Sequence, residues 1–417
     1  MQFDKKLKSN LNSCNFVAVA LGLIVGFICK GTENSIFGLD QIRTIGNVVL
    51  MLMSWLAIPF VFFRIIQIMS KAKNIKQHTN VIGKVIVYFF ATSLVACFIG
   101  IIVALTFKYT GLFKVLSLPS FDYTDITPKL NFMMGVSNIT VADLVDGMLK
   151  ENMLTNMLFA TLVGFAVAKS GEGGEFVGKF FDSASIVVEM MADFVVLLAP
   201  IGVFAMTARL VFDFRTVNID QVFWLAIALL IGYALHFFIV YFYALKFLAK
   251  MSIRKFFKHI CPAMIFAMTS TSSLASITIS AEACDDLGMG KNLSGYVLPS
   301  GYIANMDGTV IYLAICTIYF ATGLGVSLSF GQLMLMTLVI ILTELGAAGV
   351  PHAGLVMLSM VMKVMGLDTE LIMLVIALDV FFDIGRTCLN VMGDLIAVAC
   401  AEQWCKKDEN LAEEILK

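Results

Sequence analysis

Five polar residues recur at intervals of three and four in an otherwise apolar stretch near the end of the chain: Asp379, Asp383, Arg386, Asn390 and Asp394. In a helix this spacing places them on one face. A charge at the centre of a bilayer costs about 2.5–3.5 kcal/mol on insertion scales, so a face with four charges cannot be directed at lipid. We expect this face to line a polar or cation-filled cavity. A structural salt-bridge cluster is the alternative, but it leaves the third acid and the amide without a role.

A second group of oxygen-bearing residues interrupts an earlier apolar stretch, in the sequence Asn305-Met306-Asp307-Gly308-Thr309. A carboxylate, an amide and a freed backbone carbonyl close together form the kind of oxygen-rich cage that binds a hard cation. Ligands that are all oxygen disfavour soft transition metals. The nine cysteines are scattered through apolar segments without metal-binding spacing, as expected of small packing residues.

Two more apolar stretches, residues 259–281 and 331–362, are interrupted midway by helix-breaking residues. These are Thr269-Ser270-Thr271-Ser272-Ser273 and Gly346-Ala347-Ala348-Gly349-Val350-Pro351. A broken helix offers free N–H groups at one end and carbonyls at the other, which suit an anion and a cation respectively. Hydroxyl-mediated helix packing remains open for the Ser/Thr run, and a simple kink for the Gly-rich run.

The elements that hold these residues are predicted to be membrane-spanning helices. Of the 417 residues 59% are apolar and 14% charged, against about 25% charged in soluble domains. Stretches without charge reach the roughly 20 residues needed to span a bilayer at 11–29, 44–63, 85–107 and 221–245, and the longer stretch 310–343 must contain a turn. We predict an all-α polytopic membrane protein with about eight transmembrane helices and two re-entrant helical hairpins.

The order hairpin, helix, hairpin, helix after residue 256 predicts two inverted repeats. Paired interrupted segments in a membrane protein point to a transporter site near the bilayer midplane, because non-helical backbone at that depth must be buried or line a cavity. The net charge of −1 indicates no nucleic-acid partner.

The distribution of lysine and arginine predicts the orientation in the membrane. Basic residues cluster at 5–8, at 71–76 and at 250–258, and these clusters share one side if spans four and five lie near residues 153–168 and 194–208. Because basic loops stay in the cytoplasm, we expect a cytoplasmic N-terminus and an extracellular loop at 110–150. The Lys-rich start before an apolar run resembles a signal peptide, but no cleavage site follows it, so we expect a retained first helix.

The three motifs together resemble the dicarboxylate/amino acid:cation symporter family, the sodium-coupled glutamate and aspartate transporter homologues. They are the 305–309 sequence, the 346–351 sequence and Asp383-x-x-Arg386-Thr387-x-x-Asn390-x-x-Gly393-Asp394. The resemblance extends over nearly the whole chain, including Ile58-Pro59-Phe60-Val61-Phe62-Phe63 and Ala199-Pro200-Ile201-Gly202. It implies a secondary active symporter, not an enzyme, that imports aspartate or glutamate with sodium ions by alternating access.

The resemblance also implies site residues. The family's substrate contacts fall on Thr271, Thr309, Val350, Gly354, Asp383, Arg386, Thr387 and Asn390. Asp383 would hold the amino group, and Arg386 would bind the distal carboxylate with its planar fork of donors. Two sodium sites fall on Asp307 with Asn305, Thr92 and Ser93, and on Asp394 with Gly301, Asn305 and Asn390. No other cofactor is implied.

A homotrimer in the cell (inner) membrane with an elevator-type mechanism is implied as well. The scaffold would comprise residues 1–80 (helices 1–2) and 110–215 (helices 4–5 with the loop 110–150). The transport domain would comprise 81–109 (helix 3), 216–255 (helix 6) and the core 256–402 with both hairpins and helices 7 and 8. Residues 403–417 would form a cytoplasmic tail.

Four residues depart from the family pattern. Phe89 replaces a tyrosine near the Thr92/Ser93 site, and Leu313 stands where proton- and potassium-coupled animal members have an acid. Glu344 and His352 replace small residues of the second hairpin. Glu344 is either a cation ligand or proton carrier, or a solvated residue at the membrane boundary. His352, which can titrate near neutral pH, is either a gate sensor or solvated.

Three other functions fit these residues less well. A proton-coupled C4-dicarboxylate carrier would leave Asp383 without an ammonium partner, at a cost of about 1–3 kcal/mol. An intramembrane aspartyl protease needs two carboxylates that share a proton, whereas Arg386 would keep Asp383 ionised. A passive channel does not need the lid-like hairpins.

Overall fold

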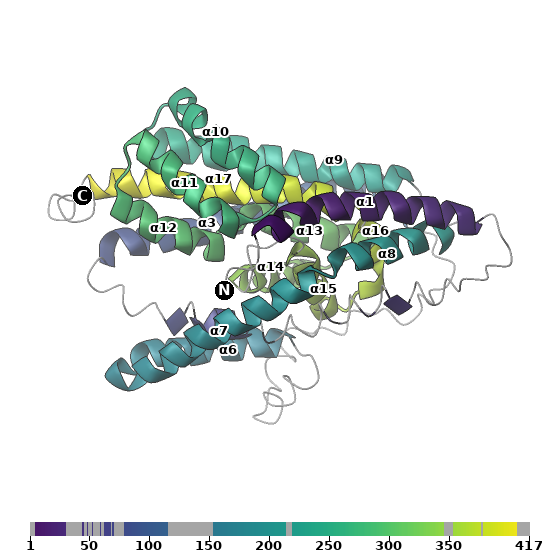
Figure 1. The fold of residues 1–417 in the computed structure, drawn as a ribbon, viewed down its shortest axis with the longest axis horizontal. Coiled ribbons are helices and arrows are strands. Elements are labelled where there is room, and N and C mark those ends of the chain that lie inside the picture. The colour runs from purple at the N-terminus through teal and green to yellow at the C-terminus, as the bar shows by residue number, and fades with distance from the viewer. Residues whose placement is uncertain are drawn as a thin grey trace.

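The computed structural model describes residues 5–30, 79–115, 153–213, 219–345, 353–376 and 378–406, with short pieces between 44 and 70. Every regular element in these parts of the chain is helical. Long helices run side by side along the longest axis of the molecule, and the pair α6 and α7 lies apart from the main bundle (Figure 1). The all-α class predicted from the uncharged stretches is therefore confirmed for the described residues.

Four of the six predicted N-terminal spans correspond to helices. They are α1 (Lys5–Lys30), α3 (Thr79–Tyr109), α6 (Met153–Lys169) and α9 (Ile219–His236), which continues through π-helical turns at Phe237–Tyr241 and Ala244–Leu248. Most of the span at 44–63 and most of the loop 110–150 lie outside the described residues. Among the described residues, the stretches long and apolar enough to cross a membrane are Gly83–Tyr109, Asp220–Leu248, Leu293–Gly323 and Phe381–Cys405.

The fifth predicted span, at residues 194–208, is wrong as a single helix. The chain forms α7 (Glu175–Val196), turns at Leu197 and Leu198, and begins α8 (Ala199–Asp213). Pro200 explains the break, because proline fits the first turn of a helix but has no N–H to bond the carbonyl four residues earlier, at residue 196, where α7 ends. α8 packs along α1, where a Cβ on Gly22 would overlap the backbone of Phe204, so the small residue lets the two helices approach closely.

The second half of the chain has the predicted order of broken helices. α10 (Ile253–Ser270) and α11 (Ser273–Leu287) meet at residues 271–272, within the predicted Ser/Thr interruption. α12 (Lys291–Ala304) and α13 (Asp307–Gly323) are separated at 305–306. A turn follows before α14 (Phe330–Leu345), and α15 (Ala353–Val364) forms the other arm of the second hairpin. The tip at 346–352 lies outside the described residues.

The helices that carry the polar motifs lie at the centre of the bundle. Every residue of α13 is buried, and so are residues 389–402 of α17 (Asp379–Cys405), which follows the short helices at Thr369–Ile372 and Met373–Ile376. α13 packs against α3, α9, α15 and α17. A helix that is apolar all round belongs in such a core, so the motif residues at its N-terminus are held away from the surface.

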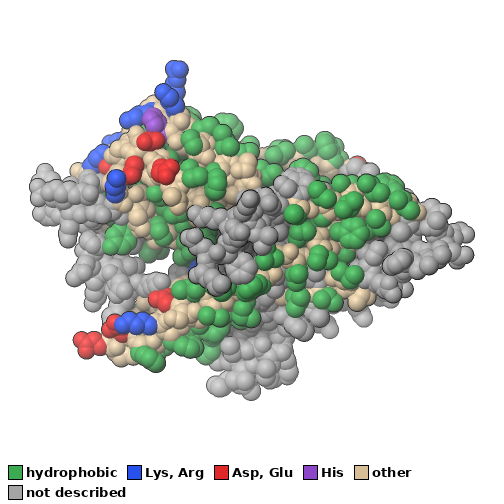
Figure 2. Space-filling model, viewed as in Figure 1, with side chains coloured by type: hydrophobic (Ala, Val, Ile, Leu, Met, Phe, Trp, Pro, Cys, Tyr) green, Lys and Arg blue, Asp and Glu red, His purple; other side chains and the backbone are tan. Residues whose placement is uncertain are grey.

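The surface has the pattern expected of a membrane protein. Large apolar side chains are exposed along α1, α3, α7 and α9, including Phe27, Val87, Phe180 and Phe238. Charged side chains gather instead at one end of the molecule, over α10 to α12 and at the α6–α7 connection (Figure 2). Because exposed apolar surface on this scale is stable in lipid and not in water, the charged groups mark an end that lies outside the hydrocarbon.

Candidate functional site

The polar face predicted on the last span lies on α17, and all five of its side chains are buried. They do not form one continuous patch. Asp379, Asp383 and Arg386 contact one another near the start of α17, whereas Asp394 lies two turns further along and contacts the break between α12 and α13. The face predicted from the spacing therefore serves two separate polar clusters.

The first, which we call the arginine cluster, comprises Tyr312, Gly354, Asp379, Asp383, Arg386 and Thr387. Arg386 donates from Nε to Asp383 Oδ1 at 3.0 Å, and its Nη2 lies 2.6 Å from the same oxygen. Its Nη1 lies 3.5 Å from Asp379 Oδ1. Thr387 adds a hydroxyl hydrogen bond to Asp383 Oδ1 at 3.2 Å. All three nitrogens of the guanidinium thus face carboxylates of its own helix.

Neighbouring helices enclose this guanidinium on two sides. The ring of Tyr312 in α13 lies 4.7 Å from Arg386 Cζ, within the range of a cation–π contact. A Cβ on Gly354, near the start of α15, would overlap the guanidinium. Only glycine leaves room for Arg386 there, so the second hairpin covers the arginine cluster directly at Gly354.

Asn390 joins the arginine cluster to the start of α13. Its Nδ2 donates to Thr309 Oγ1 at 3.1 Å, and its Oδ1 accepts from Gly308 N at 2.8 Å. A Cβ on Gly308 would overlap the carbonyl oxygen of Arg386, so the two helices touch through backbone at this point. Thr309 and Asn390, both predicted to contact substrate, are brought together.

The tip of the first hairpin is a strained turn. Thr271 is buried and adopts left-handed backbone (φ 46°), which is unusual for a β-branched residue. Ser272 caps α11 by accepting from Ala275 N at 3.2 Å. Both arms of the hairpin pack against α17. Strain of this kind is common at ligand clamps, which fits the predicted contact at Thr271; the predicted contact at Val350 lies outside the described residues.

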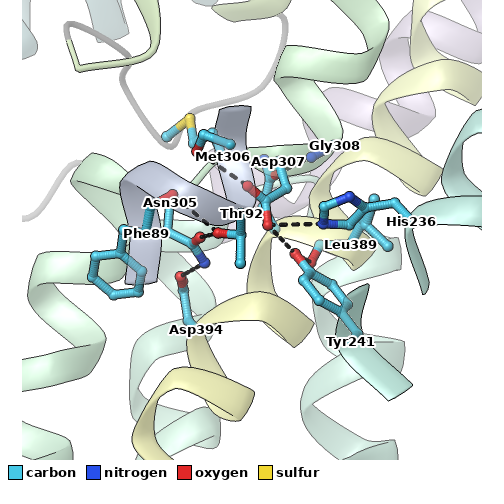
Figure 3. A network of polar contacts seen from close by, with 12 residues as sticks. Phe89, Thr92, His236, Tyr241, Asn305, Met306, Asp307, Gly308, Leu389 and Asp394 are labelled. Atoms are coloured by element: carbon cyan, nitrogen blue, oxygen red, sulfur yellow. Dashed lines mark hydrogen bonds and ion pairs between the residues drawn. The ribbon is translucent and has the colours of Figure 1, made fainter. Parts of the chain in front are cut away.

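The second cluster surrounds Asp307, and we call it the Asp307 cluster: Ser93, His236, Tyr241, Met306, Asp307 and Glu344. Asp307 Oδ2 lies 3.0 Å from His236 Nε2 and accepts from Tyr241 OH at 2.8 Å (Figure 3). Asp307 Oδ1 lies 3.1 Å from Ser93 Oγ. The carboxylate, which has no exposed surface, is therefore contacted from α3, from α9 and from the π-helical turn after it.

The remaining predicted sodium ligands adjoin this cluster. Asn305 donates from Nδ2 to Asp394 Oδ1 at 3.0 Å, and its Oδ1 accepts from Thr92 Oγ1 at 3.2 Å (Figure 3). A Cβ on Gly301 would overlap the Asp394 carboxylate. Gly301, Asn305 and Asp394 are thus in contact, and Thr92 and Ser93 approach the same break from α3.

The residues that depart from the family pattern fall in different environments. Glu344 is 2% exposed, so the alternative that it is solvated at the membrane boundary is wrong. Phe89 is also buried, and it contributes its backbone carbonyl to Thr92 Oγ1 at 3.0 Å. Leu313 is buried in α13, and His352 lies outside the described residues.

His236 and Tyr241 were not predicted as site residues. Both lie in the stretch 221–245, which contains no Asp, Glu, Lys or Arg and was therefore predicted only as an uncharged span. An ionisable residue inside a membrane span is by itself a sign of function, so the imidazole at position 236 was the available signal. Its partner could not be inferred, because residues 236 and 307 are far apart in the sequence.

The donor set around Asp307 and Asp394 suits a hard cation. Carboxylate, amide and hydroxyl oxygens converge on the break at 305–306. In the part of the chain that the structure describes, no group of three or more His, Cys, Asp or Glu side chains forms a metal-binding cluster. Oxygen donors of this kind, charged and neutral together, suit a hard cation.

Comparison with known proteins gives one family and several relatives of similar length. The profile of the sodium:dicarboxylate symporter family matches residues 12–404. The chain is 28% identical to a C4-dicarboxylate transport protein of Bacillus subtilis (strain 168), over 94% of this chain and 93% of that protein. It is 27% identical to a proton/sodium-glutamate symport protein of Geobacillus stearothermophilus, over 93% of each chain. It is 26% identical to a proton/glutamate-aspartate symporter of Bacillus subtilis (strain 168), over 94% of each.

Proposed function

The chain belongs to the sodium:dicarboxylate symporter family, and we propose that it imports an acidic amino acid, aspartate or glutamate, by sodium-coupled symport. Membership in a family of transporters and the apolar helices support a multi-pass membrane transporter rather than an enzyme. Its relatives differ in substrate and in coupling ion by their names. The choice of substrate and coupling ion for this chain rests on the arginine cluster and the Asp307 cluster.

The composition of the arginine cluster supports an amino acid substrate. Asp379 and Asp383 face one guanidinium in a buried site, so the cluster carries a net charge of −1 when both acids are ionised. A plain dicarboxylate would add two negative charges to it. An acidic amino acid brings an ammonium that can pair with Asp383 while its distal carboxylate takes the guanidinium fork. Arg386 and the substrate ammonium then each face a carboxylate, and the acidic amino acid adds one negative charge to the cluster where a dicarboxylate adds two.

The oxygen donors at the α12–α13 break support cation coupling. Asp394 accepts a hydrogen bond from Asn305 at this break, and Asp307 begins α13, which contacts Asn390 of α17 through Gly308. We propose that sodium ions bind beside these two acids and that their charge moves inward with the substrate. One net charge contributes about 2.3 kcal/mol per 100 mV, whereas tenfold accumulation of substrate costs about 1.4 kcal/mol. A trimeric assembly with an elevator motion, and cytoplasmic termini, are part of the same proposal.

Uptake of radiolabelled L-aspartate into proteoliposomes tests this function. We expect accumulation that requires an inward sodium gradient and is inhibited by unlabelled glutamate. The second candidate is a C4-dicarboxylate carrier, favoured by the similarity to the Bacillus subtilis transport protein. Uptake of radiolabelled succinate that unlabelled aspartate does not inhibit would establish that alternative. Accumulation driven by a proton gradient alone would support the proposed substrate and show that protons, not sodium ions, are coupled to its transport.

A further inference from the structure

Glu344 is a buried acid that the proposed function does not yet use. It lies one residue before the end of α14, the first arm of the second hairpin, and points toward the break between α12 and α13. Its Oε1 accepts from Met306 N at 2.6 Å and lies 2.6 Å from Ser93 Oγ. The hairpin is therefore in contact with the Asp307 cluster through a side chain.

The Ser93 hydroxyl lies within hydrogen-bonding distance of two carboxylates. Its Oγ lies 2.6 Å from Glu344 Oε1 and 3.1 Å from Asp307 Oδ1. A serine hydroxyl has one hydrogen, so it can donate to one of these carboxylates only. When both acids are ionised, the other carboxylate oxygen faces an oxygen lone pair, and two acids are held within reach of the same small group.

The other oxygen of Asp307 is already occupied by protein donors. Tyr241 OH and His236 Nε2 both contact Oδ2. His236 Nδ1 is buried without a hydrogen-bond partner among the described residues, so the tautomer that donates from Nε2 leaves no N–H group unpaired. Oδ1 is therefore the oxygen that Asp307 can offer to a ligand, and it faces Ser93 and Glu344.

The positive charge that would match these acids is not supplied by a basic side chain. Among the described residues, neither Asp307 nor Glu344 forms an ion pair with lysine or arginine; the recorded partner is His236, on Asp307. The aromatic ring of Phe89 adds no side-chain oxygen to this wall, where α3 offers the hydroxyls of Thr92 and Ser93. A hard cation would complete both the charge and the hydrogen-bond balance.

We propose that Glu344 is a ligand of the coupling cation, which it holds together with Asp307 Oδ1 and the Ser93 hydroxyl. This inference rests on the proposed function, cation-coupled transport, and adds a residue to its site. Because Glu344 belongs to the second hairpin, the ion joins that hairpin to α3 and to the α12–α13 break.

Sodium binding to the purified protein tests the proposal without substrate or transport. The thermal unfolding temperature is measured in detergent at increasing NaCl, with choline chloride holding the ionic strength constant. Glu344→Gln keeps the size of the side chain and removes its charge. We expect the sodium concentration for half-maximal stabilisation to rise at least about tenfold, the lower end of the loss seen when partners of metal ligands are removed.

Glu402→Gln is the matched control. Glu402 is also a buried acid of the bundle, but it binds Gly290 N at 3.1 Å and Lys406 at 3.2 Å at the other end of α17. Its variant should retain the wild-type sodium concentration. If the glutamine variant of Glu344 does not fold, Glu344→Asp keeps the charge and retracts it by one methylene, and should weaken sodium binding in the same direction by a smaller factor.

The outcomes separate this inference from the proposed function. A sodium response that is unchanged in the Glu344 variants and present in wild type overturns the role of Glu344 alone. A wild-type protein that takes up aspartate but shows no stabilisation by sodium overturns both sodium coupling and this ligand. A protein that does not bind aspartate but shows the expected shift in the Glu344 variant overturns the substrate and retains the cation ligand.

Discussion

The arginine cluster and the Asp307 cluster both bury carboxylates in the centre of the bundle, but they balance the charge differently. In the arginine cluster, two acids face a guanidinium within hydrogen-bonding distance. In the Asp307 cluster, the acids are contacted by a hydroxyl, a phenol, an imidazole and a backbone amide. Buried charges need partners of opposite sign. Both acids of the first cluster contact a guanidinium, although one negative charge is in excess there, whereas among the described residues no lysine or arginine contacts the acids of the second.

This difference indicates how each cluster responds to its ligand. A substrate entering the arginine cluster must displace existing contacts of Arg386, so its affinity is the difference between two sets of charge-assisted hydrogen bonds. A cation entering the Asp307 cluster displaces little and relieves repulsion. We therefore expect cation binding to come first and to prepare the hairpin for substrate.

The largest effect is expected from Arg386→Ala. It removes the cation that matches Asp379 and Asp383, and breaking a buried ion pair typically costs about 3–5 kcal/mol. Aspartate binding should fall by more than about 100-fold. Calorimetric titration of the detergent-solubilised variant, checked for a monodisperse elution peak, measures this. The exposed Arg254→Ala is the control. Unchanged aspartate affinity would remove Arg386 from the substrate site.

Much of the arginine cluster could be predicted because local rules govern it. The spacing of Asp383, Arg386 and Asn390 defines one helical face, and the Ser/Thr run ends α10 where a break was expected. The partner choice of Arg386 could not be predicted, since its side chain reaches both Asp379 and Asp383 on the same face. The Asp307 cluster was harder still, because its members come from distant helices: His236 contacts Asp307, and Glu344 contacts Ser93 and Met306.

A smaller but still large effect is expected from Gly354→Ala. The added methyl group overlaps the Arg386 guanidinium, and overpacking of a well-packed site costs about 1–3 kcal/mol. Aspartate affinity should therefore fall by about 10- to 100-fold while sodium binding stays near the wild-type value. Gly331→Ala, in the other arm of the hairpin, meets no atom within 4 Å and should leave both unchanged. Equal effects of the two variants would contradict the contact between the hairpin and the arginine cluster.

Asp307→Asn tests the Asp307 cluster, and it should change sodium binding while aspartate affinity is retained. The variant keeps the shape of the side chain and removes the charge that attracts a cation. We expect the sodium requirement of aspartate uptake to rise by about tenfold while aspartate affinity at saturating sodium is retained. The exposed Asp285→Asn, whose partner Lys291 is a surface residue, is the control. A sodium response identical to wild type would exclude Asp307 from cation binding.

The smallest effects distinguish two buried tyrosines near the end of α9. Tyr241 donates to Asp307 at 2.8 Å, whereas Tyr233 OH is buried without a hydrogen-bond partner among the residues that the structure describes. Tyr241→Phe removes one of the donors that hold Asp307 Oδ2, so it should lower the free energy of unfolding by about 1 kcal/mol and weaken sodium binding. Tyr233→Phe removes a hydroxyl that has no hydrogen-bond partner in the described part of the chain, so its free energy of unfolding should stay within about 0.5 kcal/mol of wild type.

Thermal unfolding of both variants, with and without sodium, measures the contrast between Tyr241 and Tyr233. If neutral donors orient Asp307, the Tyr241 variant loses part of the sodium-dependent stabilisation, and the Tyr233 variant loses none. If both variants behave like wild type, His236 and Ser93 suffice to hold the carboxylate, and the phenol serves packing alone. The two variants therefore test whether neutral hydrogen-bond donors orient Asp307 for cation binding. In the arginine cluster, by contrast, the acids already contact a charged side chain.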